Sequence, residues 1–286
     1  MLLRILAPNP SPMTAEGTNS YILGSEVPGG DVAVIDPGPD DADHLAALVA
    51  AVGGRQVRAI LVTHSHLDHS PGAAPLSGML DAPVLAFGPS DAGRSATMAA
   101  LGDLVGGGEG VDAGFAPDVR LGDGDIVSGD GWTLQAHHTP GHMGNHLSFE
   151  WLERRDVFTG DTVMGWASTM ISPPDGDLGQ FMASLDRLEA FDAVRFLPGH
   201  GNAVTAPAAR CRALRTHRLG REAAILGALI RPCRIPDLVA AIYADIPPAL
   251  HGAAARNVLA HLIYLVETGR AVADPEIGIG AEWRAE

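Results

Sequence analysis

Four side chains that can bind a metal ion fall within six residues of this chain. The segment 63–69 reads THSHLDH and contains His64, His66, Asp68 and His69. Neutral imidazole and carboxylate groups together suit zinc and similar first-row ions. Alternate residues of an extended loop point the same way, so we expect His64 and His66 to bind one ion, while Asp68 and His69 follow a turn and can face a second. One such cluster cannot complete two tetrahedral shells, so further ligands are required downstream.

Three further candidate ligands follow, each after a short apolar run and at a turn marked by glycine or proline. His142 ends the segment HTPGH, Asp161 ends FTGD, and His200 lies in LPGHG. A lone histidine is more often a structural residue than a ligand. Seven candidate ligands at such turns instead predict a metal centre.

This combination resembles the metallo-β-lactamase superfamily, whose signature is HxHxDH followed by His, Asp and His in that order. The resemblance covers residues 1–205. It implies two metal ions per chain, zinc in the first place with iron or manganese as alternatives, bridged by Asp161. The implied ligands of one ion are His64, His66 and His142, and those of the other are Asp68, His69 and His200.

The chemistry that the resemblance implies is hydrolysis. A water between two ions about 3.5–4 Å apart is acidified from a pKa of 15.7 toward about 7 and becomes a bridging hydroxide. Asp68 can take or relay the proton, so Asp68 and Asp161 are the implied catalytic residues. His66 stands where flavo-diiron relatives carry glutamate, and Asp161 stands where many true β-lactamases carry cysteine. Both differences favour hydrolysis of something other than a β-lactam, although persulfide dioxygenases share much of the motif and leave an iron oxygenase open.

The elements that must position these residues can be read from apolar spacing. Short apolar or alternating runs predict strands at residues 2–6, 20–23, 31–35, 59–62, 83–87, 125–127, 132–137, 147–150, 157–158 and 194–197. Helical spacing predicts helices at residues 41–52, 72–80 and 179–192. The fold that the resemblance implies is α+β, an αββα sandwich of two mixed sheets with helices on both outer faces. Asp36 matches the first motif of the family, which implies that it supports the metal-binding loop by hydrogen bonds.

Several polar residues near the motifs have two interpretations. Asn19 is either close to the site, as in the early strand of the family, or a turn residue. We interpret His138 and His146 as structural, with His146 a candidate to hydrogen-bond the ligands. Ser168 and Thr169 follow Asp161 and either orient a substrate oxygen or form a turn.

Residues 88–119 lose clear periodicity and are either a lid beside the site or a plain surface excursion. After residue 205 the composition shifts, and helices are predicted at residues 208–230, 236–244 and 250–268, followed by a wing-like strand at 269–272. This part is similar to the small winged-helix-like domain of the lactamase-beta-two-like group. We therefore expect a catalytic domain at 1–205 and a helical, winged-helix-like domain at 206–286. The third helix has few basic residues, which disfavours contact with nucleic acid. We instead expect residues 206–286 to pack on the sandwich and to form a wall of the metal cleft.

Composition narrows the partners and the compartment. The chain has 286 residues, is 46% hydrophobic and carries a net charge of −15, which repels nucleic acid and anionic membranes at long range. Its two cysteines, Cys211 and Cys233, form no disulfide framework and fit a reducing compartment. The N-terminus is too soon interrupted for a signal peptide, and no run of 18 apolar residues occurs. These features predict a cytoplasmic protein without membrane contact, and they leave the oligomeric state open.

Three functions follow from these observations. The favoured one is hydrolysis of a small ester, thioester or lactone, similar to glyoxalase II, with Arg256 and Arg270 as candidate groups for binding substrate carboxylates. The alternative is a single-strand-specific endoribonuclease or phosphodiesterase of the same superfamily, which the acidic charge disfavours. A non-catalytic metal-binding protein is disfavoured by retention of all seven ligands.

Overall fold

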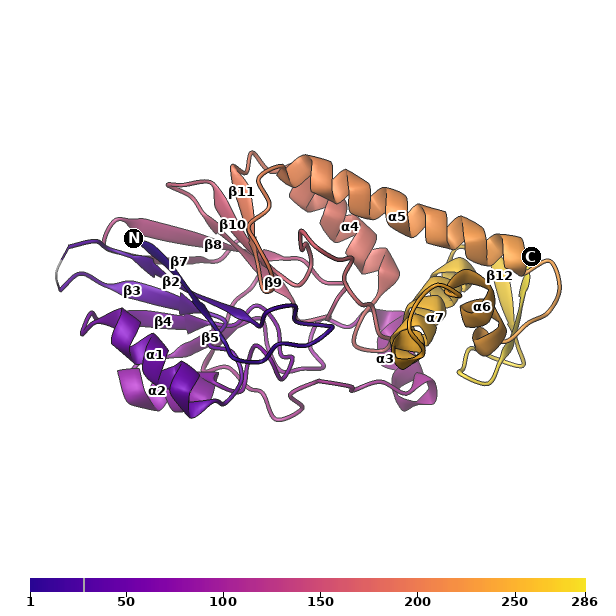
Figure 1. The fold of residues 1–286 in the computed structure, drawn as a ribbon, viewed down its shortest axis with the longest axis horizontal. Coiled ribbons are helices and arrows are strands. Elements are labelled where there is room, and N and C mark those ends of the chain that lie inside the picture. The colour runs from indigo at the N-terminus through magenta and orange to yellow at the C-terminus, as the bar shows by residue number, and fades with distance from the viewer. Residues whose placement is uncertain (28) are drawn as a thin grey trace.

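The computed structural model describes residues 1–27 and 29–286, and it places two β-sheets face to face with helices on both outer sides (Figure 1). The first sheet has the strand order β1-β2-β3-β4-β5-β6, and the second has the order β11-β10-β9-β8-β7. The αββα sandwich that the sequence predicted is therefore confirmed.

The first sheet combines antiparallel and parallel strands. Its strands are β1 (Leu2–Leu6), β2 (Asn19–Gly24), β3 (Val32–Ile35), β4 (Val57–Leu61), β5 (Val84–Ala86) and β6 (Val119–Arg120). The pairs from β3 to β6 are parallel, so these strands end at the same edge. The outer face is covered by α1 (Ala42–Val52) and α2 (Ala73–Leu80). Because β3 is covered on one face by these helices and on the other by the second sheet, all four of its residues are buried.

The second sheet consists of β7 (Ile126–Gly129), β8 (Trp132–His138), β9 (Leu147–Trp151), β10 (Asp156–Gly160) and β11 (Arg195–Pro198). Only β10 and β11 pair in parallel. The helix α4 (Leu178–Glu189) packs on its outer face through Phe181, Leu185 and Leu188. Between the two sheets lies an aromatic core that includes Trp132, Phe149 and Phe158.

The C-terminal part is mainly helical and ends in a two-stranded hairpin. Its elements are α5 (Pro207–Ala228), α6 (Ile235–Ile242), η2 (Pro248–Leu250), α7 (His251–Glu267), β12 (Ala271–Asp274) and β13 (Glu282–Ala285). The fully buried Trp283 joins the hairpin to the helices. The three helices and the wing agree with the sequence prediction, whereas β13, the partner of the wing strand, was not predicted.

The segment 88–119 contains two short helices, α3 (Ala96–Leu101) and η1 (Gly102–Val105), where the sequence predicted irregular structure. Met98 and Val105 are buried in the same apolar cluster as α6 and α7. In Figure 1 α3 lies beside α7, at the end of the molecule away from the N-terminus. The segment is therefore neither a plain surface excursion nor only a lid, because two of its side chains form part of the core at the C-terminal end.

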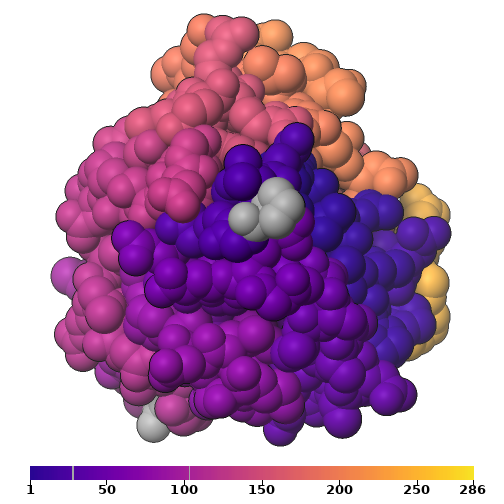
Figure 2. Space-filling view, turned by 90° about the vertical axis from the view of Figure 1, so that its left-hand side faces the viewer, coloured from indigo at the N-terminus to yellow at the C-terminus, as the bar shows by residue number. Residues whose placement is uncertain are grey.

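The C-terminal elements gather at one end of the sandwich. Viewed from the opposite end, the surface is formed mainly by the N-terminal two-thirds of the chain, and the later elements show only at the margins (Figure 2). Among the described residues, no helix has the length and apolar character needed to cross a membrane.

Candidate metal centre

Asp36 fixes the first metal-binding motif to the edge of the first sheet, where β3 and β4 end. Asp36 adopts a left-handed φ of 51°, which is uncommon outside glycine and turns its carboxylate toward the neighbouring loop. The carboxylate accepts hydrogen bonds from the Thr63 backbone N–H at 2.7 Å and from the Thr63 hydroxyl at 2.8 Å. It also accepts one from Nδ1–H of His69 at 3.0 Å. Asp36 therefore supports the loop as predicted.

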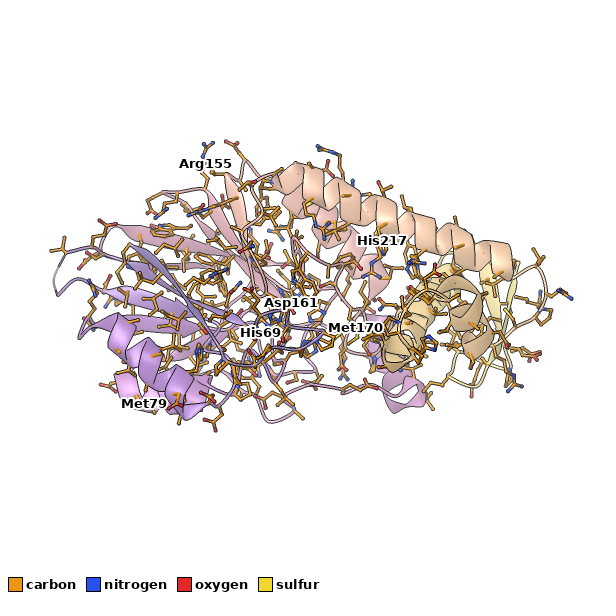
Figure 3. The ribbon with its side chains drawn as sticks, in the orientation of Figure 1. His69, Met79, Arg155, Asp161, Met170 and His217 are labelled. Carbon is orange, nitrogen blue, oxygen red and sulfur yellow. The ribbon has the colours of Figure 1, made fainter. Side chains whose placement is uncertain are left out.

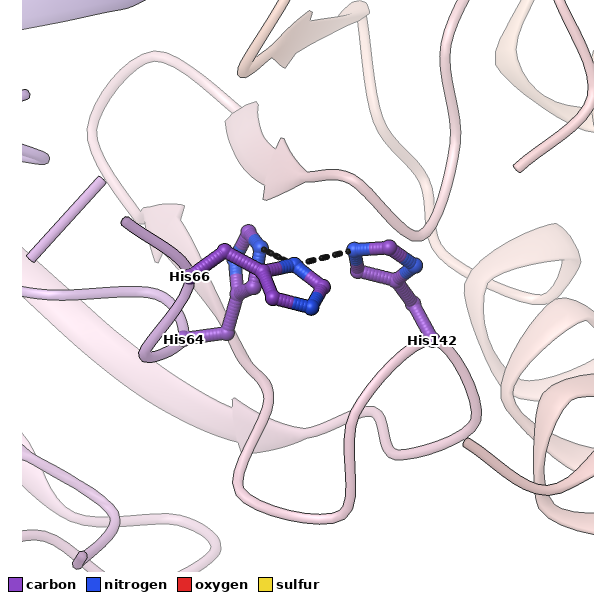
Figure 4. Close-up of side chains that lie close together, drawn as sticks. All are labelled: His64, His66 and His142. Atoms are coloured by element: carbon purple, nitrogen blue, oxygen red, sulfur yellow. Dashed lines mark hydrogen bonds between the residues drawn. The ribbon is translucent and has the colours of Figure 1, made fainter. Parts of the chain in front are cut away.

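Three imidazole nitrogens converge at one point of the site (Figure 4). Nδ1 of His66 lies 3.0 Å from Nε2 of His64 and 2.9 Å from Nε2 of His142. His64 and His66 come from the loop after β4, whereas His142 comes from the loop between β8 and β9. The two sheets thus contribute to one group of atoms that could bind a metal ion.

A second group forms beside the first from Asp68, His69 and His200. Nε2 of His200 lies 3.0 Å from Oδ2 of Asp68 and 3.4 Å from Nε2 of His69. His200 follows β11 of the second sheet, so this group also joins the two sheets.

Asp161 lies between the two groups. Its carboxylate oxygens are 3.6 Å from Nε2 of His69, 3.3 Å from Nε2 of His200 and 3.8 Å from Nε2 of His142. Glycines make this approach possible: a Cβ at Gly199 would lie 2.4 Å from Oδ1 of Asp161. Figure 3 shows Asp161 and His69 together, at the end of the sandwich that faces the C-terminal helices. The structure therefore brings together all seven residues that the sequence predicted.

The other ring nitrogen of each of four histidines is bound by a fixed acceptor. His69 donates from Nδ1–H to Asp36, and His142 donates from Nδ1–H to the carbonyl of Met170 at 2.7 Å. Nδ1–H of His200 donates to the carbonyl of Gly17 at 3.2 Å, and Nδ1 of His64 contacts the Thr63 hydroxyl at 3.0 Å. Because Nδ1 carries a proton in these contacts, Nε2 of each ring is the nitrogen that faces the centre and that would bind a metal ion in its unprotonated form.

The first three imidazoles are neutral at pH 7. Burial, with the neighbouring His142, lowers the pKa of His66 to about 3. Burial and the adjacent imidazoles also lower the pKa of His64 well below its ordinary value, and burial lowers the pKa of His142 despite the nearby Asp161. Neutral imidazole is the form that binds metal ions.

Carboxylates dominate the second group. Burial alone would lower the pKa of His69, but Asp68 and Asp161 outweigh it and raise that pKa to about 9. Asp161 and Asp68 likewise overcome burial and raise the pKa of His200 to about 11. Burial would raise the pKa of Asp161, but the attraction of His200 and His69 holds it well below its usual range. Protons on the two imidazoles thus balance the carboxylates, and a divalent cation can replace them.

The donor set fits first-row divalent metal ions. Nε2 of His64 and Nε2 of His142 both face Nδ1 of His66, and a single proton on that nitrogen could serve only one of the two contacts, so a cation among the three nitrogens would satisfy them better. Oδ1 of Asp161 is buried and has no hydrogen-bond partner in the described part of the chain. Nitrogen and carboxylate ligands in this number suit zinc or iron rather than calcium or magnesium.

A pocket of about 440 Å³ opens beside these residues. Most of its wall is apolar, and the apolar residues come from four loops: Pro12, Met13, Pro39, Leu67, Met164, Trp166, Ala167 and Met170. Glu109 is the one charged side chain among the described lining residues outside the metal-binding groups, and none of the described lining residues is lysine or arginine. The segment 88–119 borders the pocket through Glu109 and Gly110, and the loop after Asp161 lines it as expected.

The prediction that residues 206–286 form a wall of the cleft was wrong, because no described residue of that range lines the pocket. The C-terminal helices instead contact the back of the loop that follows Asp161. Arg210 donates to the carbonyls of Met164 and Ala167, both at 2.7 Å. The helices therefore act on the pocket through this loop.

The two arginines that the sequence suggested as groups for binding substrate carboxylates form internal hydrogen bonds instead. Arg256 donates to Ser172 at 2.8 Å and to the carbonyl of Val105, and Arg270 pairs with Glu222 at 2.7 Å. Neither lines the pocket. Their suggested role is therefore corrected to a structural one.

The remaining candidates support the site from behind. Asn19 lies in β2, not in a turn, and donates to the carbonyls of Pro198 and Gly201 at 2.9 Å, which orients the loop of His200. Nε2 of His146 accepts from the backbone N–H of Asp161 at 3.2 Å, and His138 donates to the carbonyl of Gly144 at 2.8 Å.

Ser168 and Thr169 were the two candidates to orient a substrate oxygen. The Thr169 hydroxyl donates to the Asp161 carbonyl and is therefore not free for substrate. Ser168 lines the pocket. Five residues support the site only through contacts between segments that are distant in the sequence, and no sequence motif marks them. They are Thr169, Met170, Arg210, Arg218 and Asn257.

Known proteins share both the motif and the architecture. The metallo-beta-lactamase superfamily profile matches residues 13–200, and that of the beta-lactamase associated winged helix domain matches residues 235–283. The chain is 31% identical to the beta-lactamase-like protein 2 homolog of Caenorhabditis elegans, over 93% of this chain and 84% of that protein. It is 32% identical to the atrochrysone carboxyl ACP thioesterase of Aspergillus fumigatus, over 70% of this chain but only 56% of that protein.

The architecture matches that of a metallo-beta-lactamase family protein from Thermus thermophilus. The TM-score is 0.78 at 24% identity, over 100% of this chain and 98% of that one. This similarity extends through the C-terminal helices as well as the sandwich. By the extent of these matches, together with the seven converging residues, the chain belongs to the metallo-β-lactamase superfamily of metal-dependent hydrolases and carries its associated winged-helix domain.

Proposed function

We propose that this chain is a hydrolase with a dinuclear centre, zinc in the first place, that cleaves a small ester, thioester or lactone with an uncharged, apolar acyl part. The observation that carries this proposal is the pair of metal-binding groups with Asp161 between them, next to a mainly apolar pocket whose described lining contains no lysine or arginine. His64, His66 and His142 would bind one ion. Asp68, His69 and His200 would bind the other.

Two bound ions would acidify a water between them and polarise the substrate oxygen. Asp161 would bridge them, and its fixed backbone keeps its carboxylate in place during the reaction. Asp68 is the one ligand of its group that is not fully buried, so it can receive a proton at a carboxylate oxygen and pass it to the leaving group. The Nδ1–H bonds of His142 and His200 keep both imidazoles in one orientation.

The pocket lining supports the acyl part of the proposal. Met13, Met164 and Met170 offer polarizable side chains, and Trp166 offers an aromatic surface, so a flat or branched apolar group can pack among them. Glu109 would repel a substrate carboxylate or phosphate at this position. A relative named as an ACP thioesterase fits the same class of bond.

These features disfavour the alternative endoribonuclease. RNA binding depends on basic groups that neutralise phosphates. The described lining of the pocket contains no lysine or arginine, and Arg256 is hydrogen-bonded to Ser172 and Val105.

A panel of substrates tests the proposal on the zinc-loaded protein. The panel contains an aryl ester, an aliphatic thioester, a lactone, an ester with a free carboxylate, a bis(4-nitrophenyl) phosphate and a short single-stranded RNA. We expect kcat/KM to be highest for one of the uncharged acyl compounds and to fall for the carboxylate analogue. Turnover of RNA or the phosphodiester above all acyl substrates would overturn the proposal.

A further inference from the structure

The segment Thr169–Ile171 is connected to two of the seven residues of the centre. The Thr169 hydroxyl donates to the backbone carbonyl of Asp161. The Met170 carbonyl accepts from Nδ1–H of His142 at 2.7 Å. One short segment therefore controls the backbone of Asp161 and the ring orientation of His142.

The other side of the same segment is held by the C-terminal helices. Arg218 of α5 donates to the carbonyl of Thr169 and, at 3.0 Å, to Oδ1 of Asn257 on α7. The same oxygen of Asn257 accepts from the backbone N–H of Ile171 at 3.3 Å. Figure 3 shows Met170 on the side of Asp161 that faces the C-terminal helices. An unbroken series of hydrogen bonds thus runs from α5 and α7 to the metal centre.

Arg218 is an unusual choice for structural stability alone. Its side chain is 3% exposed, and no carboxylate in the described part of the chain pairs with it. Besides its two oxygen acceptors it contacts the face of Phe181, 5.3 Å from the ring centre, and its Nε has no partner among the described residues. Burial of a charge without a counterion is costly, and an apolar residue at such a position is often as stable or more stable. The presence of a buried guanidinium at this position is therefore better explained by the segment that it holds in place than by a gain in stability.

We propose that Arg218 and Asn257 are positioning residues through which the C-terminal helices α5 and α7 set the metal affinity and turnover of the centre. They act by holding the two ends of the segment Thr169–Ile171. That segment in turn holds Asp161 through the Thr169 hydroxyl and His142 through the Met170 carbonyl. This inference rests on the proposed ligand roles of Asp161 and His142. It assigns the C-terminal helices a role in shaping the catalytic centre that needs no contact with substrate or nucleic acid.

The chain offers a matched control on the same helix. Arg221 of α5 also donates to a backbone carbonyl, that of Ile242 at 3.0 Å, and also lies over an aromatic ring, that of Tyr243 at 4.5 Å. Its contacts lead to α6 and not to the loop after Asp161. Replacing either arginine by methionine removes a charge and comparable contacts, but only Arg218→Met disconnects Thr169.

The experiment compares the full-length wild type with Arg218→Met, Arg218→Lys, Asn257→Ala and Arg221→Met. Each protein is stripped of metal, and zinc affinity is measured by competition with a chromophoric chelator, alongside melting temperature and kcat and KM for the best ester of the panel. Loss of a group that orients a metal ligand costs about 10- to 100-fold in metal affinity or activity. We expect Arg218→Met and Asn257→Ala to weaken zinc affinity and lower kcat by about tenfold with little change in KM, and Arg218→Lys to recover part of both. Arg221→Met should keep both values close to those of the wild type.

A purely structural role predicts a different result. If Arg218→Met and Asn257→Ala lower only the melting temperature while zinc affinity and kcat of the folded protein stay unchanged, or if Arg221→Met weakens zinc equally, the inference is wrong. Should Arg218→Met not fold, Asn257→Ala decides, because it leaves the bond from Arg218 to Thr169 intact and removes the acceptor for Ile171. A wild type that binds fewer than two zinc ions would contradict the proposed function itself, a result separate from the comparison among variants.

Discussion

Single residues at the centre combine buried imidazoles with ionised carboxylates in one small volume. Asp161 shows the consequence most directly, since its Oδ1 is buried without a hydrogen-bond partner among the described residues while His69 and His200 lie within 3.6 Å of its carboxylate. A buried acceptor without a donor is costly, and a bound cation would satisfy it. The metal centre is thus expected to depend on this carboxylate more than the fold does.

Replacement of Asp161 by alanine is expected to abolish turnover and spare the fold. Groups that merely orient a metal ligand contribute about 10- to 100-fold, so loss of the bridging group should reduce kcat/KM by more than about 100-fold. The backbone bonds of Asp161 to His146 and Thr169 remain available to alanine. Kinetics on zinc-loaded protein and circular dichroism measure the two effects, and retained turnover in Asp161→Ala would exclude the bridging role.

His261 is expected to contribute to acid sensitivity independently of the metal centre. It is 1% exposed on α7, and both ring nitrogens lack partners among the described residues. Burial, followed by Arg218, His217 and Arg221 of α5, lowers its pKa to about 3. The unfolded chain has an ordinary pKa of about 6.5, so between these two values the unfolded state binds a proton that the folded state does not, and stability falls as pH falls.

The stability of the wild type relative to His261→Leu should therefore be constant above about pH 7. Below that it should decrease by up to about 1.4 kcal/mol per pH unit. Urea unfolding of both metal-free proteins at several pH values measures this difference. Parallel pH profiles would show that His261 is protonated in the fold or is not buried as described.

Among the elements, the loop between β10 and α4 contributes more residues to the pocket wall than any other described segment, and α5 holds this loop in place. Arg210 binds two carbonyls of this loop, those of Met164 and Ala167. The loop is thus anchored by a helix that lies outside the sandwich, which explains why pocket shape and the C-terminal part are linked. The division into residues 1–205 and 206–286 stays a prediction, since Met98 and Val105 also pack with the C-terminal helices.

Arg210→Met should raise KM by roughly tenfold and change kcat little. A hydrogen bond to a charged group contributes about 1.5 kcal/mol, which corresponds to about tenfold in binding. The pocket wall binds substrate and transition state equally, so its loss affects KM and not kcat. The control is Arg212→Met on the same helix, which removes only an exposed pair with Glu189. Steady-state kinetics with the best ester compares the two. Equal KM values for both variants would contradict a role for Arg210 in pocket shape.

For the whole molecule, bound metal would join the two sheets at one end. The loops of the first sheet supply His64, His66, Asp68 and His69, while those of the second supply the other three residues. A ligand that binds only the folded state stabilises it by mass action, by about 2.7 kcal/mol at a concentration of about 100 Kd. The melting temperature should therefore report metal occupancy.

We expect two metal ions per chain by elemental analysis of zinc-reconstituted protein. Removal of both by a chelator should lower the melting temperature by roughly 10–20 °C, given about 2.7 kcal/mol for each ion and about 2–4 °C per kcal/mol for a domain of about 200 residues. Readdition of zinc should restore the value. A stoichiometry at or below one after reconstitution would contradict the dinuclear proposal.

Local sequence was sufficient for the residues of the centre and for most elements that carry them. Four candidate ligands lie in one short loop, and the other three stand at Gly- or Pro-marked turns after apolar strands, so spacing alone predicts where each side chain emerges. The helices and strands of the sandwich follow apolar periodicity for the same reason. The sequence predicted the wing strand β12 in this way but did not predict β13. The four residues of β13 show little alternation of apolar and polar side chains, and the strand is held in place by the buried Trp283.

Tertiary structure alone decided how the pocket is lined and supported. Arg218 reaches Thr169 across 49 residues of chain, and Arg256 reaches Val105 across 151. Such contacts between a side chain and a distant backbone carbonyl follow no periodicity and no preferred spacing in the sequence. The sequence could therefore suggest a substrate carboxylate as the partner of Arg256 and a substrate oxygen as the partner of Thr169. In the folded protein both side chains form internal hydrogen bonds to backbone carbonyls, because a buried carbonyl without a hydrogen-bond donor is costly.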